Sequence, residues 1–193
     1  PTDYERDAAG LEQGEFVTAS CFCRRAALEA VGGFDERFTT AWREDSDLQF
    51  MFMERGDPIA RVADAVVIHP VRPASWGISI SQQRKSMFNA LLYKKHPQLY
   101  RERIQAALPW RYYLICASAA GALIACVLGR RRASLAGLAL WAALVGRFCS
   151  QRLRHTARTP THIAEMLVIS ALLPPLAIFW RLRGALKYRI VFL

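Results

Sequence analysis

Acidic residues are scarce in the C-terminal part of this sequence: residues 108–193 contain one, Glu165, against 12 lysines and arginines. Residues 1–107 carry 14 basic and 15 acidic side chains, a net charge of −1. The net charge of +10 therefore comes wholly from the C-terminal part, where the arginines flank apolar runs. This distribution argues against a nucleic-acid-binding protein and indicates contact with anionic lipid headgroups.

The sequence also lacks the paired cysteines of a metal site or a disulfide framework. Its five cysteines are an odd number, and none falls at a spacing typical of zinc ligands. We expect all five to be small, buried hydrophobic side chains in a reducing compartment. No secretory signal opens the chain, which starts at Pro1 and not at a methionine, so we expect a fragment or a processed boundary.

The first 107 residues alternate short apolar segments with helical patterns. Two segments rich in β-branched or aromatic residues, 15–23 and 59–69, are predicted to form strands. Helices are predicted over the segments 24–31, 45–55, 78–96 and 97–107. Because strands that alternate with helices indicate an α/β fold, we expect one α/β domain in residues 1–107.

Residues 108–193 form the second predicted region, a membrane-associated helical tail. Three of its runs contain no charged residue: 112–129, 134–146 and 166–180. The last is interrupted by Pro174-Pro175, and each is shorter than the ~20 residues that a perpendicular span needs. Arginines follow every run, so three crossings would place basic clusters on both faces, against the positive-inside tendency. Spanning helices, in-plane hairpins with every arginine cluster on the cytoplasmic face, and a soluble helical bundle all stay open.

Three short motifs in the first region occur together in a specific order. GGFDERF covers residues 32–38, REDSDL covers residues 43–48, and a predicted strand ends with His69 before Pro70. With this order and spacing, residues 14–100 resemble the C-terminal, acceptor-side half of family 2 glycosyltransferases, which have the GT-A fold. NALLYKKHP at 89–97 and GALKYR at 184–189 are similar to membrane-associated bacterial members. The resemblance implies a partial GT-A domain followed by apolar helices.

The acidic pair of REDSDL is the candidate catalytic element. An inverting sugar transfer needs a base that takes the proton of the acceptor hydroxyl, and a carboxylate can do this. The resemblance implies that Asp45 is this base. The alternative is that Asp45 only caps the following helix, a position that would also fix its carboxylate. Glu44 is expected to orient the loop or bind the acceptor, and Asp47 to support the first helical turn.

The remaining acceptor-side candidates come from the loop before this pair. Gly32 and Gly33 would let the backbone approach a ligand, or they simply end the preceding helix. Asp35 and Glu36 would position the acceptor loop or cap it. Trp42 is a candidate platform for stacking on a sugar, and a buried aromatic is the alternative.

The resemblance also implies a divalent metal, Mn²⁺ or Mg²⁺, which would neutralise the leaving diphosphate. His69 is the candidate ligand, with the remaining ligands expected in a missing N-terminal half; a structural histidine is the alternative. The family's Asp-x-Asp motif and nucleotide-binding strands are missing, since Asp45-Ser46-Asp47 has the letters but lies in the acceptor-side element. Arg84 and Lys85 are candidate contacts for the donor diphosphate, or part of a solvated helix face.

The function implied is transfer of one sugar from a nucleotide sugar to a lipid-linked or cell-surface glycan acceptor, with inversion. A single addition is expected because residues 82–85 lack the tryptophan of the Gln-x-x-Arg-Trp motif of processive members. The expected partners are the donor, the acceptor and membrane lipids, with no nucleic acid, and the catalytic part is expected to face the cytoplasm. The alternative is a non-catalytic, membrane-anchored scaffold that retains only the acceptor half.

Overall fold

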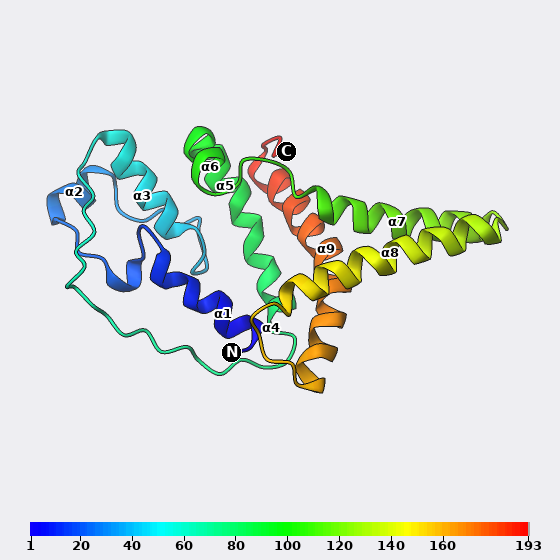
Figure 1. The fold of residues 1–193 in the computed structure, drawn as a ribbon. Coiled ribbons are helices and arrows are strands. Elements are labelled where there is room, and N and C mark those ends of the chain that lie inside the picture. The colour runs from blue at the N-terminus through cyan, green and yellow to red at the C-terminus, as the bar shows by residue number, and fades with distance from the viewer. Residues whose placement is uncertain (193) are drawn as a thin grey trace. The chain divides into compact units, whose positions relative to one another are not determined.

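The protein folds as helices. A computed structural model describes residues 1–192, and no strand occurs among them. The α-helices are α1 (Asp3–Ala9), α2 (Arg25–Ala30), α3 (Glu44–Arg55), α4 (Ile78–Gln82), α5 (Phe88–Lys95), α6 (Pro97–Arg103), α7 (Trp110–Val127), α8 (Arg131–Arg152) and α9 (Pro160–Tyr188) (Figure 1). Three 3-10 turns accompany them: η1 (Gly10–Gln13), η2 (Thr18–Ser20) and η3 (Gln83–Met87). The predicted α/β fold, with its partial GT-A domain, is therefore wrong for the described chain.

The two predicted strands fail for a common reason, which is the lack of a pairing partner. Segment 15–23 contains the turn η2, and segment 59–69 is an irregular, exposed stretch. Few of their apolar side chains reach a core: Phe16 packs against Phe52, but Phe22 is 92% exposed and Ile68 87% exposed. A strand is stable only when its backbone pairs and one face is covered, and a lone pair of strands is marginal in water. The β-branched composition gives these segments a propensity for strands, but the fold provides no partner strand, so the prediction of strands is wrong.

The predicted helices of the first region are confirmed, with one interruption. The bounds of α2 and α3 lie within one residue of those expected, and α6 ends four residues earlier than expected. The single helix expected over 78–96 is divided into α4, η3 and α5. Six consecutive polar residues lie between Ile80 and Met87, so no apolar face holds the middle of this segment in an α-helix.

The tail helices are longer than the apolar runs that predicted them. α7, α8 and α9 have 18, 22 and 29 residues and are long and apolar enough to cross a membrane. α9 continues through Pro174 and Pro175, so the expected interruption is wrong. Apolar helices tolerate proline because neighbouring groups satisfy the freed carbonyl groups. All five cysteines are free thiols, but only Cys149 is buried, so the expectation of burial is wrong for the other four.

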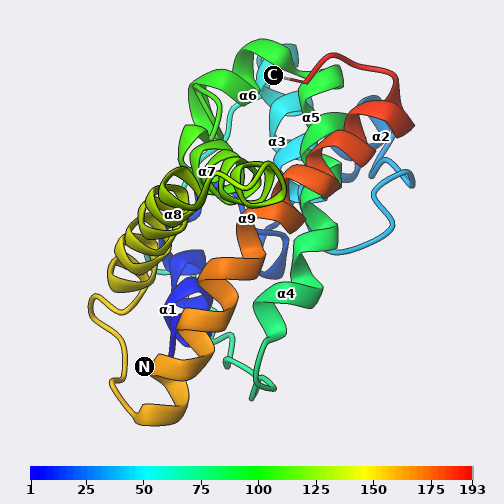
Figure 2. The same cartoon turned by 90° about the vertical axis from the view of Figure 1, so that its right-hand side faces the viewer.

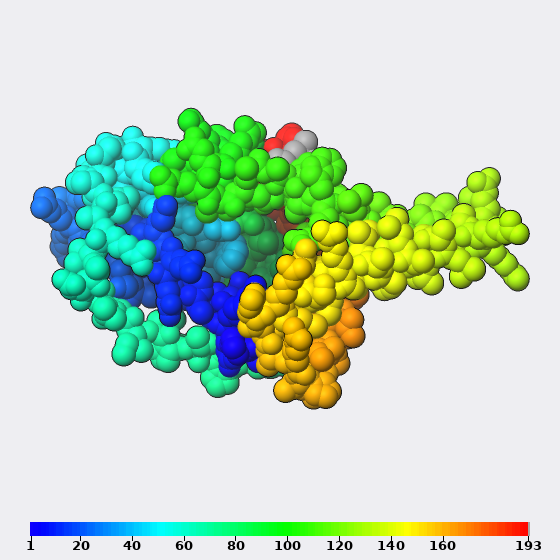
Figure 3. All heavy atoms as spheres, viewed as in Figure 1, coloured from blue at the N-terminus to red at the C-terminus, as the bar shows by residue number. Residues whose placement is uncertain are grey.

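The chain divides into two compact units, which are described one at a time. The first comprises residues 1–6, 74–84 and 108–180. In it α7 and α8 lie side by side in both views (Figures 1 and 2), and a Cβ on Gly137 would lie 3.0 Å from the Cβ of Ala122. Its core is Ile115, Val145, Phe148, Cys149, Met166, Ile169 and Leu173. The α7–α8 surface, yellow-green in Figure 3, exposes Leu114, Leu123, Ile124, Leu135, Leu138 and Leu140.

The second unit comprises residues 7–73, 85–107 and 181–193. α5 forms its centre, and Leu91 and Leu92 are fully buried. Aromatic side chains complete the core and come from the loop before α3, from α3, α5 and α6, and from the end of the chain: Phe38, Phe50, Phe88, Tyr93, Tyr100, Tyr188 and Phe192. This unit carries most of the residues singled out above. The domain boundary predicted near residue 107 stays a prediction.

Candidate active site

The entry into α3 is set by an unusual backbone conformation at Arg43. This residue is the N-cap of α3 and has a φ of 75°, in the left-handed region that side chains other than glycine rarely adopt. Its guanidinium donates from Nε to Oδ1 of Asn89 at 2.8 Å and lies 4.8 Å from the ring centroid of Trp42. Burial lowers the pKa of Arg43. These contacts fix the direction in which the acidic turn leaves the loop.

Asp45 is the second residue of α3 and is half-buried. Its Oδ1 accepts the backbone N–H of Ser46 at 2.7 Å and the Ser46 hydroxyl at 3.3 Å. Arg43, and not Asp45, holds the N-cap position, but the Asp45 carboxylate accepts a backbone N–H of the first turn, so its catalytic role stays a prediction. The carboxylate lies in the first turn of the helix and is partly accessible, and a carboxylate within reach of an acceptor hydroxyl can act as a general base.

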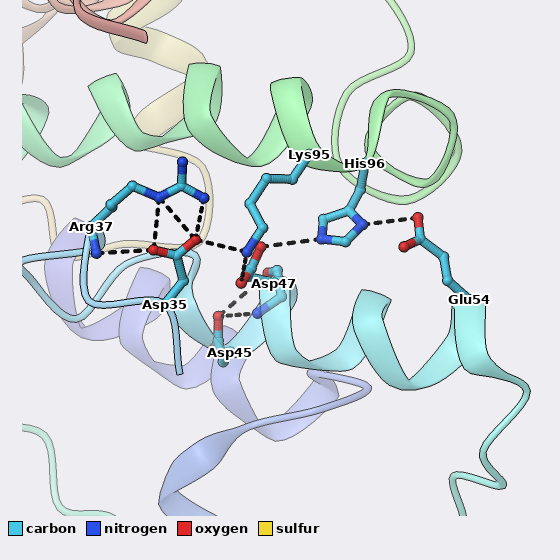
Figure 4. Close-up of polar contacts among 8 residues, drawn as sticks. Asp35, Arg37, Asp45, Asp47, Glu54, Lys95 and His96 are labelled. Atoms are coloured by element: carbon cyan, nitrogen blue, oxygen red, sulfur yellow. Dashed lines mark hydrogen bonds and ion pairs between the residues drawn. The ribbon is translucent and has the colours of Figure 1, made fainter. Parts of the chain in front are cut away.

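Asp47, two residues further on, has a different environment (Figure 4). Its side chain is 1% exposed. Oδ2 accepts a hydrogen bond from Nζ of Lys95 at 2.6 Å, and Oδ1 lies 3.1 Å from Nε2 of His96. Both oxygens are thus occupied by groups from α5 and from the residue that follows it. Asp47 therefore connects the first turn of α3 to the end of α5. The sequence predicted only that Asp47 supports the first turn of its own helix.

The network continues beyond Asp47 in both directions. Nζ of Lys95 also donates to Oδ2 of Asp35 at 2.8 Å, and Arg37 donates to the same carboxylate at 2.6 Å. At the other end, Nδ1 of His96 lies 2.8 Å from Oε1 of Glu54 (Figure 4). An imidazole that faces carboxylates with both nitrogens donates to both of them only when it is protonated.

The charges in this network shift two titrations in physically consistent directions. Arg37, and after it Lys95, hold the pKa of Asp35 well below its usual value, against the effect of burial. Burial lowers the pKa of His96, but the hydrogen bonds to Asp47 and Glu54 outweigh it, so the net pKa is raised. The contacts in the network therefore favour the ionised form of Asp35 and the protonated form of His96.

Glu44 is the acid whose bonding is incomplete. Its Oε2 is buried and has no hydrogen-bond partner among residues 1–192. Burial raises the pKa of Glu44, and the charge of Lys85 opposes this increase. Oγ1 of Thr40, in the same loop, is buried and equally unsatisfied within the described chain. Buried polar atoms without a partner are rare in folded proteins, so this loop is unusual in having two of them.

Gly32, Gly33 and Trp42 lie in the loop between α2 and α3, as predicted. Gly32 and Gly33 have φ values of 80° and 74°, and their N–H groups donate to the carbonyls of Glu29 and Leu28 at the end of α2. These bonds are those of a helix terminus, while approach of a ligand to the glycines stays a prediction. Trp42 is 39% exposed, so the buried-aromatic alternative is wrong and the stacking role stays a prediction.

The structure does not bring the other predicted residues to Asp45 as a group. Glu36 and His69 are exposed, and His69 lies in the irregular stretch and not at a strand end. Arg84 is exposed and belongs to the first unit, whereas Lys85 belongs to the second, with Asp45. The predicted roles of Glu36, His69 and the Arg84-Lys85 pair stay predictions.

The described residues do not build a complete metal site. Within 1–192, no three side chains of His, Cys, Asp or Glu converge as ligands for an ion. His69, the predicted ligand, is exposed on an irregular segment. The acids nearest the candidate base are bound to basic groups: Asp47 to Lys95 and His96, and Asp35 to Arg37. These residues therefore do not fit a divalent cation by themselves.

Sequence reasoning missed the basic half of the network. Lys95 and His96 stand in the segment KKHP, which carried the resemblance but received no role. A signal was present, because His96 directly precedes Pro97, the first residue of α6, and a helix boundary fixes a side chain there. Their common partner, Asp47, lies 48 and 49 positions earlier in the chain, so this pairing could not be predicted from the local sequence pattern.

Comparison with models of known protein families identifies a match over most of the chain. The family model described as "Glycosyl transferase family group 2" matches residues 6–181, which is most of the chain and includes both the acidic loop and the tail helices. No curated protein and no solved structure matches the sequence.

Proposed function

Because this chain belongs to glycosyl transferase family group 2 and carries a glycosyltransferase domain, we propose that it transfers a single sugar from a nucleotide sugar to an acceptor hydroxyl, with inversion. The acceptor is a lipid-linked or cell-surface glycan precursor. The observation that carries this proposal is the contrast within the first turn of α3. Asp47 is buried and bound to two basic groups, whereas Asp45 is half-buried and accepts hydrogen bonds from Ser46.

The carboxylate of Asp45 acts as the base. It takes the proton of the acceptor hydroxyl while the acceptor oxygen forms a bond to the anomeric carbon. The bond between that carbon and the diphosphate oxygen breaks, and its electron pair leaves with the nucleoside diphosphate. Attack from the face opposite the leaving group inverts the anomeric centre. Asp45 ends the step protonated and returns its proton to solvent.

The loop before α3 is proposed to hold the acceptor. The exposed ring of Trp42 offers a face for a sugar, and the unsatisfied oxygens of Glu44 and Thr40 offer hydrogen-bond acceptors for sugar hydroxyls. Asp35 is held in place by Arg37 and Lys95, which orders the Gly32-Gly33 loop beside it. Contact of the donor diphosphate with Arg84 and Lys85, and a role for Glu36, remain part of the proposal.

The tail is proposed to hold the catalytic part at the cytoplasmic face of a membrane. The apolar helices α7, α8 and α9 and the arginines at their ends support a lipid environment.

Labelling of Cys126 tests whether α7 spans the membrane. Cys126 is exposed near the end of α7, so its accessibility shows on which side of the membrane the turn between α7 and α8 lies. In a variant with Cys126 as its only cysteine, a membrane-impermeant maleimide added to whole cells labels this turn if α7 spans. Protection until the cells are opened indicates helices that lie in the plane, and labelling of a cysteine placed at Glu36 in intact cells would contradict the proposed orientation.

Transfer is tested directly with labelled donors. Membranes from cells expressing the protein are incubated with a panel of radiolabelled nucleotide sugars, and the lipid extract and glycan fraction are counted. We expect one donor to give label in one of these fractions, in a product extended by one residue whose anomeric configuration is opposite to that of the donor. No label above vector membranes for any donor would instead favour the non-catalytic scaffold.

A further inference from the structure

Lys95 and His96 occupy a corner of the second unit. Lys95 is the last residue of α5, and His96 is both the residue after α5 and the residue before Pro97 of α6. The backbone N–H of His96 donates to the carbonyl of Leu92, and its carbonyl accepts from Tyr100. This corner is therefore fixed by two helices, and side chains that leave it have a defined origin.

Both side chains converge on one carboxylate in the first turn of α3. Lys95 binds Oδ2 of Asp47 at 2.6 Å and His96 faces Oδ1 at 3.1 Å, and the Asp47 side chain is 1% exposed. Asp47 follows Asp45 by two residues in the same turn of helix. A carboxylate held at both oxygens cannot rotate without breaking a charge-assisted hydrogen bond, so the turn that carries it is held as well.

We propose that Lys95 and His96 are positioning residues, which act through Asp47 to fix the first turn of α3 and thereby the direction of the Asp45 carboxylate. This inference rests on the proposed function, in which Asp45 is the base. Neither residue touches the reacting atoms in this account. Their contribution is the placement of a base whose efficiency depends on sub-ångström geometry.

Lys95 has a second contact that widens this role. Its ammonium also binds Asp35, at 2.8 Å, in the loop that follows Gly33. One cation thus ties the loop proposed to hold the acceptor to the turn that carries the proposed base (Figure 4). Because the two acidic segments share this cation, its loss would change the distance between acceptor and base and also release each segment.

The contribution of His96 depends on its protonation. The charged groups in contact with it are Asp47 and Glu54 from α3, and its ring forms a T-shaped pair with that of Phe50. Lys95 from α5 binds the same Asp47 carboxylate and links it to Asp35. When the imidazolium loses a proton, one ring nitrogen presents a lone pair to a carboxylate, and that contact becomes repulsive. Because the hydrogen bonds to Asp47 and Glu54 raise the pKa of His96 against the effect of burial, the network is complete below that pKa and loosens as the pH rises through it.

The first test replaces Lys95 in the full-length protein. Lys95→Met removes the shared cation, and we expect kcat to fall by about ten- to a hundredfold while the donor KM changes little. Lys94→Met is the matched control, because the neighbouring lysine donates to the backbone carbonyl of Tyr188 and is outside the network. Lys95→Arg keeps a cation that can bridge Asp35 and Asp47, and we expect it to restore most of the rate. Equal kcat for Lys95→Met and Lys94→Met would overturn the proposal.

The second test uses pH and does not depend on the fold surviving Lys95→Met. In the wild type, kcat is expected to decline on the alkaline side as His96 loses its proton. His96→Gln cannot carry the charge, so its rate is lower than that of the wild type in the pH range where His96 is protonated, and this alkaline limb disappears. An identical pH profile in the two proteins would contradict the role of His96. If Asp45→Asn itself kept the normal rate, the proposed function would fail instead, so the two failures are distinguishable.

Discussion

Replacing Asp45 by asparagine is expected to lower kcat by about 10²- to 10⁴-fold, the range found when a general base is removed. Asparagine keeps the size of the side chain but cannot accept the proton of the acceptor hydroxyl. The hydrogen bonds from Ser46 go to Oδ1, which an amide oxygen can replace, so the helix start is preserved. The measurement is steady-state transfer with the donor identified from the labelled panel, with substrate binding followed separately.

Asp57→Asn is the matched control for this variant. Asp57 lies just beyond the other end of α3, where it forms a surface ion pair with Arg55 at 2.9 Å. Exposed pairs contribute little to stability, and this one is not part of the network around Asp45. We therefore expect normal kcat for Asp57→Asn. A normal rate for Asp45→Asn would remove the base assignment.

Replacing Asp47 by alanine is expected to lower the free energy of unfolding by about 3 kcal/mol, near the lower end of the range for breaking a buried ion pair. The loss leaves Lys95 and His96 without their common partner in a buried place, although Asp35 and Glu54 still compensate them in part. The pKa of His96 should fall because one of its two carboxylates is gone. Denaturant unfolding of the full chain in detergent micelles, compared with the wild type, measures the change.

Asp45→Ala completes this comparison because the two acids share one helical turn. Asp45 is half-buried and accepts its hydrogen bonds from the adjacent Ser46, so its loss should cost less than about 1 kcal/mol. The turn thus separates two effects: Asp45 variants should lose rate and keep stability, and Asp47→Ala should lose stability. Equal destabilisation by both would show that the buried pair is not the anchor described here.

The helices of this protein could be predicted from local pattern, whereas the strands could not. α3 was visible in its glycine stop and its acidic first turn, and α7 in its charge-free run. Segment 59–69 has the β-branched composition of a strand, but composition does not supply the neighbouring strand that pairing requires. The local pattern also did not predict η3, which interrupts the helix expected over 78–96. Whether the polar residues in the middle of that segment stay in an α-helix depends on contacts with neighbouring elements.

The candidate site divides in the same way. The acids Glu44, Asp45 and Asp47 could be named from one motif because they are consecutive or nearly so in the chain. The different environments of these acids could not be predicted, because the residues that bury Asp47, Lys95 and His96, lie more than 40 positions further along the chain. A buried acid and an accessible acid look alike in sequence, and only the long-range contacts assign them different roles.

The irregular stretch between α3 and α4 has a practical consequence. Residues 61–75 are exposed throughout and belong to no helix, so a protease reaches this backbone more easily than that of the helices on either side. Trypsin should cut after Arg61, while the bond after Arg72 resists because Pro73 follows it. The same stretch is the natural place to insert an epitope tag for detecting the protein without disturbing a packed element.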